Sequence, residues 1–358
     1  MKRVLLAMSG GIDSAVSAVL LQEQGFEVMG ATMRLCNSDG DPYGVSSGCF
    51  GPQEPQNRQI LERVGKKLGI QILTIDLSKQ FENEVLEYYR SNYLEGRTPN
   101  PCVVCNSRLK FGLLPKMLRD KGMEFDLFAT GHYARTRFCE QSGRWQLLKG
   151  IDPLKDQSYF LCLLTQAQLA TTLFPLGELT KARVREIAIL HGLDFLLSKA
   201  ESQDFLSEED HPRLFKSAKI EPGEMVDPLG KVVGNHRGLI HYTIGQRRHL
   251  GLSGMSEPWY VIGLDNKRNR VKVGPQSFLH KDRLTATKVN WVSIQPTSAA
   301  TRAEIKIRLG HNPVPGTLRI LPNGSVEAVF DTPQMSITSG QYAVFYDGDI
   351  LLGGGTIA

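Results

Sequence analysis

The stretch that decides the fold is LLAMSGGIDSAVSAVLL, which runs from Leu5 to Leu21. A strand pattern ends at Met8, the run Ser9-Gly10-Gly11 makes a tight turn, and a helix pattern begins near Asp13 and Ser14. Glycines let a backbone come close to a phosphate, and the N–H groups at a helix start point toward it. We therefore expect a phosphate-binding loop between the first strand and the first helix, with a purely structural glycine-rich turn as the alternative.

The ending of this loop indicates which phosphate chemistry it serves. It lacks the Gly-Lys-Ser/Thr ending of a Walker loop, so transfer of a γ-phosphate is a poor match. SGGxDS instead resembles the pyrophosphate loop of N-type ATP pyrophosphatases, which split ATP between its α and β phosphates and adenylate a substrate. Because related loops serve several classes of synthetase and sulfurtransferase, the loop alone does not identify the substrate.

Outward from the loop, strand and helix patterns alternate as far as Phe205, which is typical of a mostly parallel sheet with helices on both faces. The chain then turns irregular to about Pro275. Short strands follow beyond Phe278, and Asn323-Gly324 between two of them is a strong hairpin signal. The predicted organisation is an α/β domain, a small central domain and a C-terminal β-barrel, over residues 1–205, 206–277 and 278–358.

The composition is ordinary for a globular protein in a reducing compartment. The 358 residues are 41% hydrophobic and 22% charged, with a formal net charge of +5. This small excess permits a polyanionic partner without requiring one. The six cysteines are irregularly spaced, unlike the disulfide framework of a secreted protein. The opening MKRVLLAM begins like a signal peptide, but its apolar run is too short for one. No apolar stretch approaches the length of a membrane span. We expect a cytoplasmic protein.

A second informative segment is RTPNPCVVCNSRLKF, from Arg97 to Phe111. Asn100 is a good N-cap and Pro101 a good first helical residue, so Cys102 and Cys105 are expected to share one helical face near its positive end. That position favours thiolate over thiol, as do the nearby cations of Arg108 and Lys110. The alternative is a pair of small buried apolar residues.

Six further stretches keep the order of the motifs of bacterial tRNA-specific 2-thiouridylases, and the resemblance covers nearly the whole chain. These stretches are EGRTPNPCVVCNSRLKFGLL, DLFATGHYAR, LLKGIDPLKDQSYFL, KARVREIA, HRGLIHYTIGQRRHLGL and QYAVFYDGDILLGGGTI. The resemblance implies an adenine-nucleotide α-hydrolase-like catalytic domain, with the central domain and the barrel helping to hold tRNA. It also implies the reaction. ATP, with Mg²⁺ as its counter-ion, adenylates O2 of the wobble uridine (U34) in the anticodon loop. Sulfur then attacks C2, and AMP leaves.

The resemblance further implies the site residues. ATP would be held by Ala7, Met8, Ser9, Gly10, Gly11, Ile12, Asp13, Ser14, Met33 and Gly131. The target base would lie beside Asn100, Pro101 and Cys102, and other tRNA contacts would come from His132, Lys155, Asp156, Gln157, Arg308, Leu309 and Gln341. By residue type alone, Lys155 and Arg308 suit phosphate contacts, whereas Leu309 and Gln341 rest on the resemblance.

The sulfur chemistry departs from the family pattern. In the family, the cysteine matching Cys105 works with a downstream persulfide cysteine in a motif resembling DSQEICF. Here that stretch is ESQDFLS, from Glu201 to Ser207, and Leu206 stands at the cysteine position. The position of Cys102 is often Asp in the family. The predicted catalytic residues are therefore Cys105 and Cys102, without the standard second cysteine.

Four arrangements of the thiols are open. Cys49 follows the second strand on a loop, so it could meet Cys102 and Cys105 and hold a [4Fe–4S] cluster with one open iron. A sulfur relay would use Cys105 with Cys102 or Cys49. Structural zinc would want a fourth ligand, for which Cys36 is available. A disulfide between Cys102 and Cys105 is the remaining option.

Three functions follow from these patterns. The leading one is an ATP-dependent tRNA uridine 2-sulfurtransferase, with tRNA and a sulfur donor as partners and neither DNA nor a membrane. The donor is a sulfur-carrier protein or sulfide. The second is a pyrophosphate-loop synthetase for a small molecule, and the third is a non-catalytic tRNA- or nucleotide-binding relative.

Overall fold

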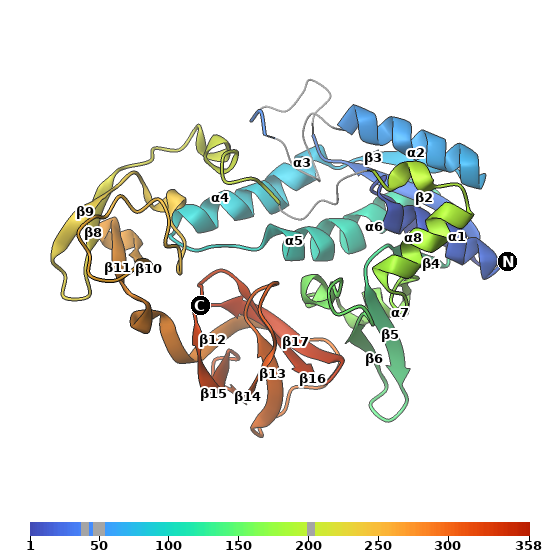
Figure 1. Ribbon diagram of the computed structural model, residues 1–358. Coiled ribbons are helices and arrows are strands. Elements are labelled where there is room, and N and C mark those ends of the chain that lie inside the picture. Colours follow the sequence, from blue (N-terminus) through green and yellow to red (C-terminus); the bar gives the residue numbers. More distant parts are fainter. Residues whose placement is uncertain (37–42, 46–53, 199–204) are drawn as a thin grey trace.

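The computed structural model describes residues 1–36, 43–45, 54–198 and 205–358. Figure 1 shows an α/β domain, a small β-sheet domain at the opposite end of the molecule, and a β-barrel below the helices that run between them. The predicted class, a parallel sheet with a small central domain and a C-terminal barrel, is confirmed. Within the described residues, no helix is both long and apolar enough to cross a bilayer.

A five-stranded parallel sheet forms the centre of the α/β domain. Its order is β3 (Ile72–Asp76), β2 (Glu27–Arg34), β1 (Arg3–Ala7), β4 (Leu127–Thr130) and β7 (Thr172–Leu173). The strand order reverses between β1 and β4. In open α/β sheets such a switch point leaves a crevice at the carboxyl ends of the strands, where ligands bind.

Helices cover both faces of this sheet because the side chains of β1 alternate between two cores. Val4 and Leu6 pack among residues of the first and last helices of the domain, whereas Leu5 packs on the opposite side. The helices are α1 (Ile12–Glu23), α2 (Glu54–Leu68), α3 (Ser78–Phe81), α4 (Glu87–Leu94), α5 (Pro101–Val104), α6 (Leu114–Asp120), α7 (Gln166–Ala170) and α8 (Lys181–Leu190). Two π-helical segments, η1 (Glu82–Leu86) and η2 (Cys105–Leu113), and two 3-10 turns, η3 (Ser158–Leu161) and η4 (Asp194–Leu196), complete the set.

The central domain is a four-stranded sheet where the sequence predicts only irregular structure. It contains η5 (His211–Phe215), β8 (Gly223–Val226), β9 (Val232–His236), η6 (Leu239–His241), β10 (Trp259–Asp265), η7 (Asn266–Arg268), β11 (Arg270–Pro275) and η8 (Gln276–Leu279). The order β10-β11-β8-β9 encloses a small core around Met225, Val261 and Val271. Strands this short, separated by turn residues, give almost no period-2 signal.

His211 connects the central domain to α4. Its Nδ1 lies 2.6 Å from the hydroxyl oxygen of Tyr89, and its Nε2 lies 2.8 Å from the carbonyl oxygen of Ile240. Because a carbonyl only accepts, Nε2 carries the proton and Nδ1 accepts from Tyr89 in the neutral ring. Tyr93 and Phe215 pack edge-on or tilted around this imidazole. A protonated ring would lose the bond from Tyr89.

We expect the free energy of unfolding to decrease as the pH falls below the ordinary histidine pKa of about 6.5. Burial lowers the pKa of His211 in the folded protein, so as the pH falls the unfolded chain takes up the proton first. The contribution of His211 to stability is therefore complete above the pKa of the unfolded state. It is lost as the pH falls from that pKa toward the pKa of the folded state. Burial also lowers the pKa of His132 far below its usual range and that of His241 to about 4.

The measurement is urea unfolding at several pH values between 7.5 and 5. His211→Gln keeps a donor for Ile240 but does not titrate, so its stability is expected to fall by about 1 kcal/mol less over this range. An identical pH dependence in the two proteins would contradict this role of His211.

The C-terminal residues form a closed six-stranded antiparallel barrel. Its strands are β12 (His280–Trp291), β13 (Thr301–Lys306), β14 (Val314–Ile320), β15 (Val326–Met335), β16 (Tyr342–Asp347) and β17 (Ile350–Ile357), and pairing of β12 with β17 closes it. The hairpin predicted at Asn323-Gly324 is confirmed between β14 and β15. Gly324 has φ +78°, a left-handed conformation that glycine adopts without strain.

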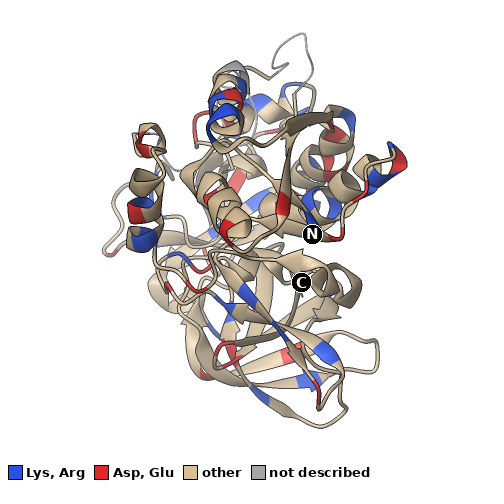
Figure 2. Cartoon of the chain, turned by 90° about the vertical axis from the view of Figure 1, so that its right-hand side faces the viewer, with Lys and Arg blue, Asp and Glu red and all other residues tan. Residues whose placement is uncertain are grey.

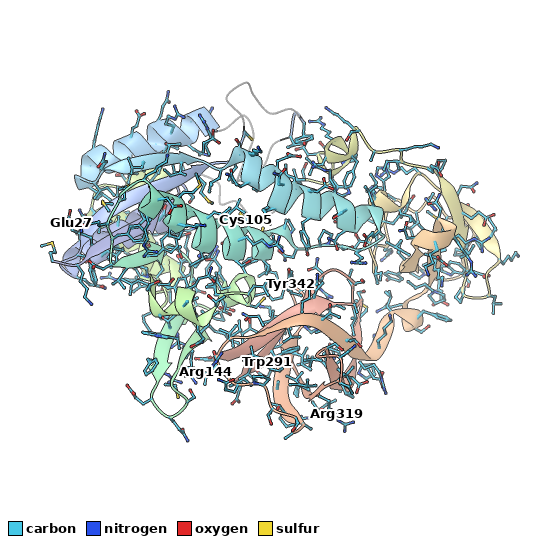
Figure 3. The ribbon with its side chains drawn as sticks, turned by 180° about the vertical axis from the view of Figure 1, so that it is seen from behind. Glu27, Cys105, Arg144, Trp291, Arg319 and Tyr342 are labelled. Atoms are coloured by element: carbon cyan, nitrogen blue, oxygen red, sulfur yellow. The ribbon has the colours of Figure 1, made fainter. Side chains whose placement is uncertain are left out.

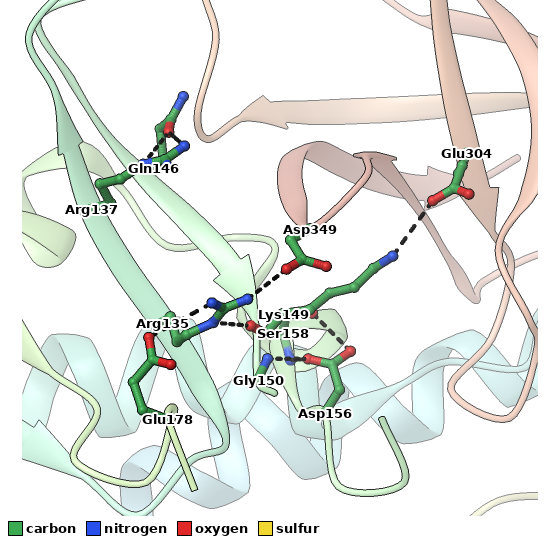
Figure 4. A network of polar contacts seen from close by, with 10 residues as sticks. All are labelled: Arg135, Arg137, Gln146, Lys149, Gly150, Asp156, Ser158, Glu178, Glu304 and Asp349. Atoms are coloured by element: carbon green, nitrogen blue, oxygen red, sulfur yellow. Dashed lines mark hydrogen bonds and ion pairs between the residues drawn. The ribbon is translucent and has the colours of Figure 1, made fainter. Parts of the chain in front are cut away.

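A hairpin from the α/β domain extends the barrel sheet, which the sequence does not predict. β5 (Ala134–Cys139) pairs with β6 (Arg144–Lys149), and β6 pairs with β17. Figure 4 shows the surrounding polar contacts: Arg135 bonds Asp349 at 2.7 Å and Lys149 lies 3.5 Å from Glu304. Such partly exposed ion pairs contribute less than about 1 kcal/mol each, so the shared sheet is the main connection.

Candidate nucleotide and thiol site

A cavity of about 270 Å³ opens at the carboxyl ends of the central strands. It brings together the phosphate loop after β1, the end of β2, the residues after β4 and the start of η2. The predicted site residues that line it are Ala7, Met8, Ser9, Asp13, Ser14, Met33, Cys105, Gly131, His132 and Gln157. Gly10, Gly11 and Ile12 continue the same loop into α1. The cavity lies at the switch point of the sheet, where such a fold holds ligands.

The loop has the geometry that its glycines predict. Gly10 has φ +73°, and Gly11 is the N-cap of α1 with an extended backbone. The Ser14 hydroxyl donates to the carbonyl oxygen of Gly11 at 3.0 Å and lies 3.4 Å from the amide nitrogen of Ser9. This hydroxyl therefore closes the turn, while the helix start faces the cavity.

Asp13 is held by two residues from distant parts of the chain. Its carboxylate accepts bonds from the Tyr133 hydroxyl at 2.7 Å and from the Lys181 ammonium at 2.7 and 2.9 Å. Lys181 is 7% exposed, and its own amide donates to Asp152 at 2.9 Å. The ammonium balances a carboxylate that would otherwise repel a phosphate in the loop.

Lys181 is a site residue that the sequence reasoning missed. It follows Thr180, which accepts a bond from the amide of Arg183 and so caps the helix, and this places Lys181 at the first position of α8. A cation at a helix N-terminus is unfavourable. A lysine at this position therefore signals an acidic partner, but the sequence does not say which one.

Gly131 presses the end of β4 against the start of α1. A Cβ atom at this position would lie 3.0 Å from the carbonyl carbon of Asp13 and 3.0 Å from the amide nitrogen of Ser14. Both neighbours are backbone atoms of the phosphate loop and its helix. Any side chain here would displace the loop.

Gly131→Ala is therefore expected to weaken nucleotide binding by about 10-fold or more, since overpacking costs about 1–3 kcal/mol. Equilibrium binding of a non-hydrolysable ATP analogue measures the effect. Gly310→Ala is the matched control, because a Cβ there meets nothing within 4 Å. Equal affinity in the wild type and Gly131→Ala would contradict the close approach.

The predicted helix cap before the cysteines is confirmed. The Asn100 side chain accepts a bond from the Val103 amide at 3.4 Å, and Pro101 is the first residue of α5. Cys102 is half-buried in this turn, while Cys105 begins η2 and lines the cavity. Figure 3 shows Cys105 on the helical segment that passes between the sheet and the barrel.

The π-helical form of η2 is supported by one glutamine. In a π-helix the hydrogen bonds join residues five apart, as the amide of Leu114 does with the carbonyl of Leu109. The side-chain amide of Gln168 donates to the carbonyls of Ser107 at 3.2 Å and Phe111 at 3.1 Å. Gln168 thus satisfies carbonyl groups of the π-helical segment.

His132 is a buried, neutral wall of the cavity. Its Nδ1 lies 2.8 Å from the hydroxyl oxygen of Thr130, and its ring stacks on Phe111 at 5.8 Å between centroids. Burial lowers the pKa of His132 far below its usual range, and the positive charge of Lys110 lowers it further. The imidazole is therefore uncharged at neutral pH.

Of the three predicted tRNA contacts in the loop after β6, only Gln157 is among the residues that line the cavity. Gln157 accepts a bond from the Tyr133 amide at 3.0 Å and lines the cavity. The Asp156 carboxylate accepts bonds from the amides of Gly150 and Ser158, both at 3.1 Å, so it holds the loop in shape (Figure 4). Lys155, just before it, is half-buried.

On the barrel, the predicted tRNA contacts fall into two groups. Leu309 is 40% exposed, and Arg308 beside it has a guanidinium nitrogen 3.4 Å from the carbonyl oxygen of Met335. Gln341 instead lies at a domain junction, where its side chain donates to the carbonyl of Thr98 at 3.0 Å. Arg308 and Leu309 are thus placed on the surface, whereas Gln341 holds the loop that leads to Asn100.

The structure describes only some of the residues on which the metal and persulfide hypotheses depend. Cys49 lies outside the described residues, and in the parts of the chain that are described no group of three or more His, Cys, Asp or Glu residues is placed to hold a metal ion. Cys36 is buried in the core. Leu206 packs half-buried against the same apolar cluster. The cluster and zinc hypotheses therefore stay predictions.

Together, the fold and the cavity are those of an α/β protein in which a glycine-rich phosphate loop and a thiol line one cavity at the switch point of a parallel sheet. Residues 2–206 match the family model described as tRNA methyl transferase HUP domain, residues 214–275 its PRC-barrel domain, and residues 281–357 the aminomethyltransferase β-barrel domain. The chain belongs to the family of tRNA-specific 2-thiouridylases.

The family assignment follows from curated relatives of nearly equal length. The chain is 43% identical over 358 residues to the tRNA-specific 2-thiouridylase MnmA of Endomicrobium trichonymphae, covering 99% of this chain and 98% of the relative. It is 43% identical to the protein of the same name from Geotalea uraniireducens, covering 99% and 95%. It is 42% identical to the protein of that name from Moorella thermoacetica, covering 99% of this chain and 98% of the relative.

Proposed function

We propose that this protein is an ATP-dependent tRNA-uridine 2-sulfurtransferase that thiolates the wobble uridine (U34). The observation that carries the proposal is that the phosphate loop and Cys105 open into the same cavity. The family's name supplies the substrate class, and the cavity supplies the two chemistries that 2-thiolation needs. The coarse function, transfer of sulfur to a tRNA uridine, is that of the family.

The reaction has two steps. O2 of the uridine attacks the α-phosphorus of ATP, and pyrophosphate leaves. A sulfur nucleophile then forms a bond to C2, and AMP leaves with the former uridine oxygen. The helix start after Gly11 faces the phosphates, and Lys181 offsets the charge of Asp13 beside them. The uridine must leave the anticodon-loop stack to reach the cavity.

The sulfur reaches C2 by way of Cys105, which is the cysteine that lines the cavity within the described part of the chain. Leu206 carries no persulfide, so the second thiol must be another one. Our first hypothesis is a [4Fe–4S] cluster on Cys49, Cys102 and Cys105, and our second is a sulfur relay that uses Cys105 with Cys102 or Cys49. Sulfide is the proposed donor to the cluster, and a sulfur-carrier protein that bears a persulfide is the proposed donor to the relay. Mg²⁺ is the proposed counter-ion of ATP.

Binding of tRNA is proposed to use Lys155, Arg308 and Leu309, which lie outside the cavity, on the α/β domain and the barrel. In Figure 2 the positions of Lys and Arg alternate with those of Asp and Glu along the ribbon, and the formal net charge is only +5. We propose that recognition relies on a few phosphate contacts, whose strength falls with salt. The cytoplasm is the proposed location.

The test combines purified protein with ATP, a sulfide source and tRNA transcripts, under anaerobic conditions. Nucleoside mass spectrometry is expected to find 2-thiouridine in a transcript with uridine at the wobble position and none where cytidine replaces it. Pyrophosphate release without RNA would favour a small-molecule synthetase. Neither product, despite tRNA binding, would favour a non-catalytic relative.

A further inference from the structure

Lys110 brings a positive charge to the thiol end of the cavity. It lines the same cavity as Cys105, His132 and the phosphate loop, and its charge is felt by the buried imidazole of His132. We propose that Lys110 is a catalytic residue whose ammonium group contacts the α-phosphate, both when the uridine oxygen attacks it and when AMP leaves. This inference rests on the proposed function, because it assigns a group to that reaction.

The π-helical form of η2 explains how Lys110 reaches the cavity. In an α-helix, with 3.6 residues per turn, two residues five apart point in directions about 140° apart. In η2 the five-residue hydrogen bonding brings such residues closer to one face, and Cys105, Lys110 and Leu114 all line the cavity. In a regular α-helix with Cys105 in the same place, the side chain of Lys110 would point about 140° away from that of Cys105.

Gln168 indicates that this irregular helix is maintained by the surrounding structure. Its amide nitrogen bonds the carbonyls of Ser107 and Phe111, while its side-chain oxygen accepts the amide of Thr165 at 2.9 Å. One side chain thus joins the start of α7 to both carbonyls. π-Helical turns are rare and occur frequently at functional sites. The arrangement fits a segment whose purpose is to aim Cys105 and Lys110 together.

The charges around the cavity leave Lys110 available for an anionic substrate. Asp13 already forms an ion pair with Lys181, and Arg108 forms one with Glu84. Within the described part of the chain, no carboxylate forms an ion pair with Lys110. A cation that lines the same cavity as a phosphate loop and a thiol is suited to a phosphate that is first attacked and then expelled, because its charge stabilises both transition states.

The test compares Lys110→Met, which keeps the aliphatic stem, with Lys116→Met, an exposed lysine on the adjoining α6. Single-turnover formation of pyrophosphate in the presence of tRNA is expected to slow by about 10²–10³-fold in Lys110→Met, as for loss of one charge-stabilising donor. Lys116→Met is expected to match the wild type. Lys110→Arg, which keeps the charge, is expected to lie between them.

Thermal melting by circular dichroism establishes that each variant is folded, and Lys110→Gln, measured in parallel, is expected to show the same loss as Lys110→Met. Wild-type rates of pyrophosphate formation in a folded Lys110→Met or Lys110→Gln protein would overturn the inference. That outcome is distinct from a failure of the proposed function, in which the wild type itself would form no tRNA-dependent pyrophosphate.

Discussion

Cys105→Ala is expected to lower 2-thiouridine formation by at least about 10³-fold, as the loss of a covalent catalytic group commonly does. Cys105 begins η2 and lines the cavity with the phosphate loop, whereas Cys102, one turn earlier, is not among the lining residues. The sequence has Leu206 where we expect a persulfide cysteine, and a leucine side chain cannot take part in carrying sulfur. Quantitative nucleoside mass spectrometry measures the effect.

The same variant separates adenylation from sulfur transfer. The phosphate loop of Cys105→Ala is unchanged, so tRNA-dependent pyrophosphate release is expected to remain within about 10-fold of the wild type. Cys139→Ser, on the exposed hairpin, is the matched control and is expected to retain full thiolation. Undiminished thiolation by Cys105→Ala would show that sulfur reaches the uridine by another route.

Lys181→Met is expected to destabilise the protein by about 3 kcal/mol and to weaken nucleotide binding. The substitution leaves the Asp13 carboxylate without its ammonium partner, and breaking a buried ion pair costs about 3–5 kcal/mol. We expect the lower end of that range because the Asp13 side chain is 32% exposed while that of Lys181 is 8% exposed. Urea unfolding gives the stability, and titration with an ATP analogue gives the affinity.

A double-mutant cycle provides the control for Lys181→Met. Asp13→Asn removes the carboxylate charge, so adding it to Lys181→Met is expected to recover part of the lost stability. Tyr133→Phe removes only the hydroxyl bond to Asp13 and is expected to cost about 1–3 kcal/mol. Additive effects of Asp13→Asn and Lys181→Met would contradict direct coupling of the two charges.

The parts of the site that could be predicted are those determined by neighbouring residues. Gly10 and Gly11 after a strand predict the loop, and Asn100 with Pro101 predicts the helix start, because capping and turn preferences act over three or four residues. The parallel sheet follows from the alternation of strands and helices. All of these are present in the structure.

The parts that could not be predicted depend on contacts between distant residues. Asp13 and Lys181 are 168 positions apart, and neither residue type indicates which residue is its partner. The hairpin of β5 and β6 reads as a continuation of the α/β domain, yet β6 pairs with β17 near the end of the chain. The π-helical form of η2 depends on Gln168, more than fifty residues downstream.

The loop before the cysteines illustrates this most fully. The amide of Thr98 donates to the carbonyl of Ser339 at 2.9 Å, and the hydroxyls of Thr98 and Thr243 lie 3.2 Å apart. Gly340, at φ +92°, lies so close to Thr98 that a Cβ would meet its backbone at 3.0 Å. Barrel and central domain thus both hold the chain that leads to Cys105, a connection no local pattern could reveal.

The most direct test of the central claim follows the oxygen atom that the reaction removes. A tRNA carrying a heavy oxygen isotope at O2 of the wobble uridine is incubated with the protein, ATP and a sulfur donor, and the products are weighed by mass spectrometry. If ATP activates that oxygen, the label appears in the phosphate of AMP, one atom for each 2-thiouridine formed. Label released into water while AMP stays light, or ATP left intact, would contradict the account.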